Sequence, residues 1–111
     1  MLVPNVRGSD GYGKRYLNLD NAEKREDSVK DIGALLDWIA TRPELDASRV
    51  GVYGGSYGGY ATLAGLTFTP DTFACGVDIV GPSNLNTLLA TIPPYWEAGK
   101  QQMYRRMGDP T

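Results

Sequence analysis

Residues 50–60 constrain this chain most, because an apolar run ends there in a glycine-rich turn that leads directly into a helical pattern. The turn reads Gly54-Gly55-Ser56-Tyr57-Gly58, the Gly-x-Ser-x-Gly form in a strand–turn–helix setting. Glycine tolerates crowded bends and permits dihedral angles that other residues avoid. The pattern predicts a sharp turn that exposes the Ser56 hydroxyl above the end of a sheet.

Ser56 is the candidate nucleophile of this turn. The first N–H groups of the following helix point to the space beside it, where an oxyanion would form during acyl transfer. A phosphate-binding loop would need a lysine before the serine, and Gly-x-Gly-x-x-Gly does not fit residues 54–59. A plain structural turn is the remaining alternative.

The composition limits the chemistry, because the 111 residues include no histidine. A serine hydroxyl is a weak nucleophile until a base takes its proton, and that base is usually a histidine oriented by a carboxylate. Three explanations stay open. Ser56 uses another base, Ser56 is not catalytic, or the chain is a piece of a larger protein.

The charge and cysteine content exclude several partner classes. The net charge is −2 with both signs interspersed, which favours neither nucleic acid nor a membrane surface as partner. No apolar stretch reaches the roughly 20 residues of a membrane span. The single cysteine, Cys75, excludes an internal disulfide and is predicted to be buried. No residue pattern calls for a metal or an organic cofactor, and none indicates a compartment.

Hydrophobic periodicity predicts alternating strands and helices. Strands are expected at residues 1–6, 49–53 and 73–80, and helices at 26–40, 57–66 and 95–107. Loops are expected at 7–13 and 14–21, and residues 85–92 are expected to form a short helix or a loop. The 49–53 strand is predicted to be buried on both faces. This alternation is typical of a parallel sheet in an α/β domain.

Four charged residues have both functional and structural interpretations. Arg7 follows the first predicted strand, and a structural ion pair is favoured over substrate contact. Asp31 and Asp37 lie on the polar side of the 26–40 helix and are predicted to be solvated. Asp78 comes one strand after Ser56, which disfavours it as a triad acid given the usual Ser…Asp/Glu…His order.

Several stretches together resemble one family of enzymes. They are residues 5–13, 46–50, 54–60, 81–84 and 107–110. They resemble the catalytic domain of the prolyl oligopeptidase family of serine peptidases, and the last two are similar to its acylaminoacyl-peptidase-like and dipeptidyl-peptidase-like branch. The resemblance covers nearly the whole chain and implies an α/β-hydrolase fold, here partial.

The resemblance also implies roles for four residues. Ser56 matches the family nucleophile, and the backbone N–H of Tyr57 matches an oxyanion donor, with its ring beside the substrate pocket. Tyr95 and Trp96 fall in the region that lines this pocket in relatives, although core packing is the favoured interpretation of both from the residues alone.

The family's remaining parts would lie outside residues 1–111. A second oxyanion segment and a β-propeller domain would precede them, and the triad aspartate and histidine would follow. The chain is therefore expected to be part of a catalytic domain. In the family's strand order the strands at 2–6 and 49–53 do not pair, so the isolated chain would expose strand edges. It is expected to be neither well folded nor active alone.

The resemblance favours a serine peptidase that hydrolyses short peptides through an acyl-enzyme. A carboxylesterase is a close alternative, because the same turn serves both chemistries. A non-catalytic, hydrolase-like interaction module is the second class of alternative.

Overall fold

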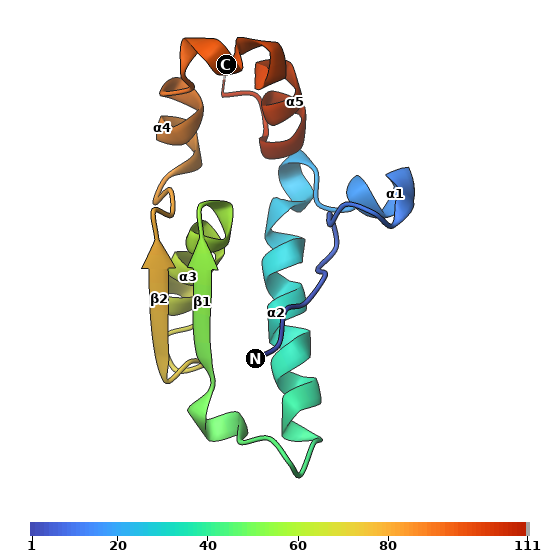
Figure 1. Cartoon of the computed structure of the whole chain (residues 1–111), viewed down its shortest axis with the longest axis vertical. Helices are drawn as coiled ribbons and strands as arrows, with labels where there is room; N and C mark the ends of the chain where they lie inside the picture. Colours follow the sequence, from blue (N-terminus) through green and yellow to red (C-terminus); the bar gives the residue numbers. More distant parts are fainter. Residues whose placement is uncertain (111) are drawn as a thin grey trace. The chain divides into compact units, whose positions relative to one another are not determined.

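The computed structural model describes residues 1–110, and the chain divides into two compact units. The first unit joins Met1–Ile32 to the segment from Asn84 onward, and the second is Gly33–Ser83. The elements in chain order, labelled in part in Figure 1, are α1 (Gly13–Leu17), the 3₁₀ turn η1 (Ala22–Lys24), α2 (Arg25–Ala40), the 3₁₀ turn η2 (Ala47–Arg49), β1 (Gly51–Gly55), α3 (Tyr57–Phe68), β2 (Cys75–Ile79), α4 (Leu85–Ala90), the 3₁₀ turn η3 (Pro94–Trp96) and α5 (Glu97–Met107).

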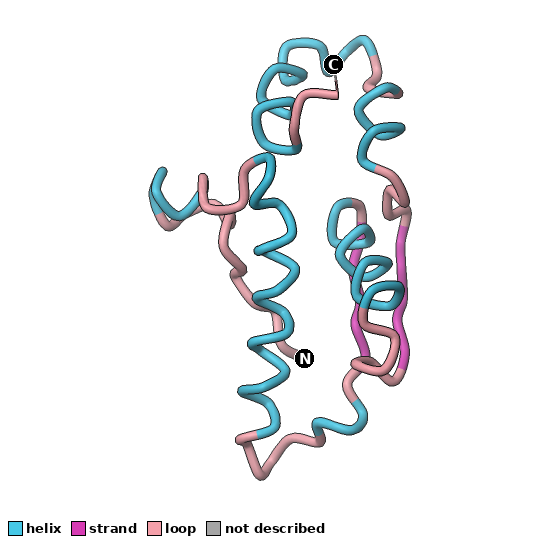
Figure 2. Tube along the Cα trace, turned by 180° about the vertical axis from the view of Figure 1, so that it is seen from behind, coloured by secondary structure: helices cyan, strands magenta, loops and turns pink. Residues whose placement is uncertain are grey.

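The second unit contains a β1-α3-β2 arrangement with parallel strands. The register runs from Gly51 opposite Cys75 to Gly55 opposite Ile79. Helix α3 packs against both strands, lying behind them in Figure 1 and in front of them in Figure 2. Its small residues Ala64 and Gly65 are buried, so the helix backbone lies close to the sheet. The predicted strand–helix–strand order around Ser56 is confirmed.

The strand predicted at residues 1–6 is not formed. A strand needs a neighbour that completes its hydrogen-bond ladder, and within residues 1–110 the only sheet consists of β1 and β2. Residues 1–6 instead precede a loop that is held by local contacts: the Tyr16 hydroxyl donates to the Asn5 carbonyl at 2.7 Å, and the Gly8 N–H donates to the Tyr16 carbonyl at 3.1 Å. The short helix α1 begins at Gly13, the last residue of the predicted 7–13 loop, and continues to Leu17, so the loop predicted at 14–21 is partly helical.

The burial predicted for the 49–53 strand and for Cys75 is also wrong. Tyr53 and Cys75 are both exposed, and every residue of β2 is accessible. The physical reason is that α3 packs on one face of the two strands and no other described helix packs on them extensively.

Among the helices of residues 1–110, none combines the length and the apolar character that a membrane span requires.

The first unit is held by a buried ion pair. Arg25 Nη1 lies 2.7 Å from Asp20 Oδ2, with side chains that are only 11% and 5% exposed. Arg25 Nη2 also donates to the Arg106 carbonyl of α5 at 2.6 Å, and Arg106 Nη2 donates to the Gly8 carbonyl at 3.1 Å. These bonds tie the N-terminal loop and the start of α2 to the last helix, although the residues lie 81 and 98 positions apart.

Candidate active site

Ser56 lies at a sharp corner between β1 and α3. It directly follows the last residue of the strand, and it is the N-cap of the helix with φ 54° and ψ −118°. Positive φ is uncommon for a residue other than glycine and costs on the order of 1–3 kcal/mol unless the surroundings enforce it. Ser56 is exposed. The predicted sharp, strained turn at an accessible serine is therefore present.

Hydrogen bonds and close packing hold this corner. The Ser56 N–H donates to the Ile79 carbonyl at 2.8 Å, which extends the parallel ladder one residue past β1. At Gly54, a Cβ would collide with the Gly58 carbonyl and lie 2.8 Å from Thr62 Oγ1. Thr62 is fully buried, and its hydroxyl donates to that same carbonyl at 3.1 Å. Only glycine fits at position 54.

A second glycine near this corner also has no room for a side chain. It is Gly59, and not Gly58, the last glycine of the Gly-x-Ser-x-Gly motif. A Cβ at Gly59 would meet Asp78 Oδ1 and lie 2.6 Å from Gly81 Cα, whereas a Cβ at Gly58 would meet nothing within 4 Å. Gly59 and Gly81 therefore bring the first turn of α3 against the loop that leaves β2.

We expect the substitution Gly59→Ala to destabilise the protein by about 1–3 kcal/mol, because the added methyl group overpacks a contact made by backbone on both sides. Gly58→Ala is the matched control, and it should be neutral or stabilising because alanine favours a helix by about 1 kcal/mol over glycine. Urea denaturation of both variants, made in the full-length protein, provides the check. Equal stabilities would show that the contact at Gly59 is not tight.

The Ser56 hydroxyl does not cap its own helix. Serine at an N-cap commonly accepts a hydrogen bond from an N–H of the first turn, but no such bond is formed here. Tyr57 is the first residue of α3, so its N–H lies in the first turn, where backbone N–H groups generally point toward the N-terminal end of the helix. The Tyr57 ring is half-buried and packs on Tyr60, with ring centroids 5.2 Å apart. The Ser56 hydroxyl and the Tyr57 backbone N–H therefore belong to adjacent residues at the corner.

Tyr95 and Trp96 lie in the other unit, at η3. Their rings contact each other edge to face, with centroids 6.1 Å apart, and are 81% and 50% exposed. The favoured core interpretation of these two residues is therefore wrong. Because η3 is followed by the polar helix α5 and carries no buried residue, their apolar surfaces are accessible for another role.

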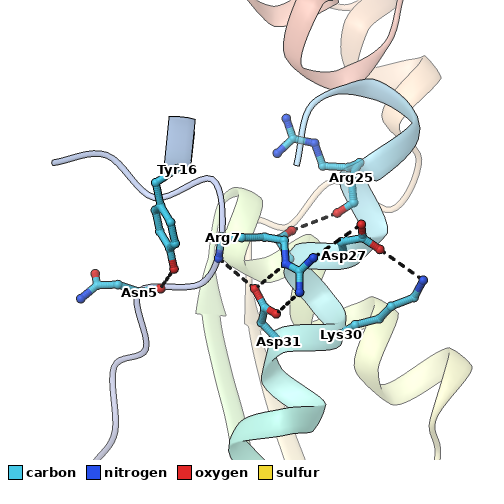
Figure 3. Close-up of polar contacts among 8 residues, drawn as sticks. Asn5, Arg7, Tyr16, Arg25, Asp27, Lys30 and Asp31 are labelled. Atoms are coloured by element: carbon cyan, nitrogen blue, oxygen red, sulfur yellow. Dashed lines mark hydrogen bonds and ion pairs between the residues drawn. The ribbon is translucent and has the colours of Figure 1, made fainter. Parts of the chain in front are cut away.

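Arg7 forms the predicted structural ion pair. Its Nε and Nη2 donate to the two carboxylate oxygens of Asp31 at 2.9 and 2.7 Å, and its backbone N–H donates to Asp31 Oδ2 at 2.9 Å (Figure 3). Arg7 Nη1 also lies 3.7 Å from Asp27 Oδ2. The prediction that Asp31 is simply solvated is wrong, because this bidentate partner comes from a loop distant in sequence. Asp37 is exposed, as predicted.

The hydrogen bonds from Arg7 hold the pKa of Asp31 below its ordinary value, although desolvation opposes them. The folded protein therefore binds this proton more weakly than the unfolded chain does. We expect the stabilising effect of Asp31 to be complete above the ordinary aspartate pKa of about 4 and to be lost as the pH falls through the lower folded value. The check is the difference in stability between the full-length wild type and its Asp31→Asn variant from pH 7 to pH 2, with Asp37→Asn as control. A difference that does not change with pH would contradict the ion-pair interpretation.

The sequence matches a known family over nearly its full length. The sequence model of the prolyl oligopeptidase family matches residues 1–108. The chain belongs to the prolyl oligopeptidase family.

Relatives within the prolyl oligopeptidase family are similar to this chain over almost all of it. A dipeptidyl aminopeptidase BIII from Pseudoxanthomonas mexicana is 54% identical over 99% of the chain, and a dipeptidyl peptidase family member 6 from Caenorhabditis elegans is 48% identical over 97%. The chain spans 16% and 15% of the lengths of these two proteins.

A solved structure identifies the fold. An acylaminoacyl peptidase from Pyrococcus horikoshii superposes with a TM-score of 0.77 at 27% identity, covering 95% of this chain and 17% of that one. The chain therefore has part of the α/β-hydrolase fold of the prolyl oligopeptidase family.

Within this member of the prolyl oligopeptidase family, the described residues do not supply a complete acyl-transfer site. The sequence contains no histidine to accept the serine proton. Within residues 1–110, no group of three or more His, Cys, Asp or Glu side chains is arranged to hold a metal ion.

Asp78 accepts a hydrogen bond from the Gly81 N–H at 2.9 Å. The motif that predicts the elbow gives no signal for this contact.

Proposed function

We propose that this chain carries the nucleophile elbow of a serine peptidase, with Ser56 as the nucleophile. The observation that supports this most strongly is the exposed Ser56 at a positive-φ corner between a parallel strand and a helix, with its hydroxyl not used as a helix cap. Membership of the prolyl oligopeptidase family supports the same role.

In the proposed reaction, Ser56 Oγ bonds to the carbonyl carbon of the scissile peptide bond while its proton passes to a general base. The Tyr57 N–H donates to the oxygen that becomes negative in the tetrahedral intermediate. The intermediate collapses as the leaving amine takes up the proton, which leaves an ester on Ser56. Water, deprotonated by the same base, then cleaves this ester and frees the serine.

The base and its orienting carboxylate are proposed to come from outside residues 1–111. We propose that these residues are one part of an α/β-hydrolase catalytic domain, in a longer protein that also supplies the triad aspartate and histidine, a second oxyanion segment and a β-propeller. The small share of each relative's length that the chain spans supports this proposal. The proposed reaction uses no metal and no organic cofactor.

The proposed substrates are short peptides. One relative is named a dipeptidyl aminopeptidase, another a dipeptidyl peptidase family member, and the superposed structure is an acylaminoacyl peptidase. These names support peptides as the substrate class. We propose that the Tyr57 ring borders the pocket for the side chain before the scissile bond. We also propose that Tyr95 and Trp96 bind substrate.

The test compares substrate classes in the full-length protein. Chromogenic dipeptidyl and acylaminoacyl amides are assayed beside a short acyl ester, before and after treatment with a fluorophosphonate. We expect hydrolysis of the amides that is lost in step with phosphonylation. Turnover of the ester alone would indicate a carboxylesterase. A protein that neither reacts with the reagent nor hydrolyses any substrate would be an interaction module.

A further inference from the structure

The last residue of β2 and the loop that follows it each contact the elbow. The Ile79 carbonyl accepts the Ser56 N–H at 2.8 Å. In the loop, Gly81 packs on Gly59: a Cβ at Gly81 would lie 2.5 Å from the Gly59 carbonyl carbon and 2.7 Å from its Cα. The position of this loop and the position of Ser56 are therefore coupled.

The shape of that loop is strained and needs a restraint. Val80 has φ 49°, which is an outlier for a β-branched residue. The restraint is the Asp78 side chain, whose Oδ1 accepts the Gly81 N–H at 2.9 Å across the strained residue. A Cβ at either Gly59 or Gly81 would collide with Asp78 Oδ1. This oxygen therefore packs against both glycines.

We propose that Asp78 is a positioning residue for Ser56. Its Oδ1 holds the Ile79–Gly81 turn in place, and the Ile79 carbonyl in turn holds the Ser56 backbone in the conformation that presents its hydroxyl. Asp78 touches neither the substrate nor the reacting atoms in this proposal. The inference rests on the proposed function, because it assigns a residue that supports the nucleophile named there.

The hydrogen bond, and not the charge, carries this role. An asparagine at position 78 retains an Oδ1 that accepts the Gly81 N–H, whereas alanine removes the acceptor. A misplacement of about 1 Å in a reacting group can reduce the rate by roughly 100-fold. Asp78→Ala should therefore slow the reaction of Ser56 by about 10-fold to 100-fold, and Asp78→Asn should stay within about threefold of the wild type.

The experiment measures the rate of fluorophosphonate labelling and the kcat and KM for a peptide amide, in the full-length protein. Rates are expressed per folded molecule, with the folded fraction taken from circular dichroism. Asp71→Ala removes an exposed carboxylate from the turn after α3 and is the matched control. Asp78→Leu, which fills the volume of the aspartate without an acceptor, serves as a second variant in case alanine prevents folding.

The expected result is a lower labelling rate and a lower kcat at unchanged KM for the alanine and leucine variants, near-normal rates for Asp78→Asn, and no change for Asp71→Ala. Wild-type rates in Asp78→Ala or Asp78→Leu would overturn the positioning role. An asparagine variant as slow as the alanine variant would overturn it too, because the charge would then be the cause. If the wild type is not labelled at all, the proposed function itself fails.

Discussion

Replacing Ser56 with alanine should abolish peptide hydrolysis by the full-length protein. Removing the serine of a comparable triad lowers kcat on the order of 10⁶-fold, because the covalent route is lost and only binding and oxyanion stabilisation remain. The fold should be retained, because the Ser56 side chain makes no capping bond and is exposed. The alanine also removes the hydroxyl without disturbing the N–H that donates to Ile79.

The kcat of this variant is measured with a peptide amide at saturating substrate, beside circular dichroism of the same preparation. Ser83→Ala is the matched control, since Ser83 is also exposed and lies in the same unit. It should retain wild-type kcat. An Ser56→Ala protein that keeps more than a small fraction of the activity would mean that the nucleophile lies elsewhere.

The largest expected effect on stability comes from Asp20. Its carboxylate is the buried partner of Arg25, and the two side chains are only 5% and 11% exposed. Substitution of Asp20 by asparagine preserves the shape but leaves the Arg25 guanidinium buried without this negative charge. Breaking a buried pair from one side costs about 3–5 kcal/mol. We expect a loss of stability in this range, which is a large part of the 5–15 kcal/mol of a typical protein.

Urea denaturation of the full-length wild type and of its Asp20→Asn and Asp37→Asn variants gives the comparison. Asp37 is exposed on α2, and its variant makes the same change of charge and should alter stability by no more than about 0.5 kcal/mol. A loss below about 1 kcal/mol in Asp20→Asn would contradict the view that this pair holds the first unit together.

The elbow could be predicted from the sequence because all of its signals are local. The glycines, the serine and the start of the small-residue helix lie within a few positions, so the order of strand, turn and helix follows from short-range rules. The structure places the strand at Gly51–Gly55, two residues after its predicted start, and extends the helix to Phe68. Ser56 at positive φ agrees with the predicted strain.

The features that were missed depend on contacts between distant residues. The bond between Arg25 and the Arg106 carbonyl joins residues 81 positions apart, and Asp31 meets an arginine 24 positions away. No periodicity marks such partners. The strand predicted at residues 1–6 and the burial predicted for Cys75 were wrong for a related reason, since strand formation and burial depend on what packs alongside.

The most direct test of Ser56 as the nucleophile is to identify the residue that a fluorophosphonate modifies. The full-length protein is treated with the reagent, digested and analysed by tandem mass spectrometry. We predict one phosphonyl adduct, on Ser56, with a stoichiometry that equals the loss of peptidase activity. An adduct on another residue in inactivated protein, with Ser56 unmodified, would contradict the assignment.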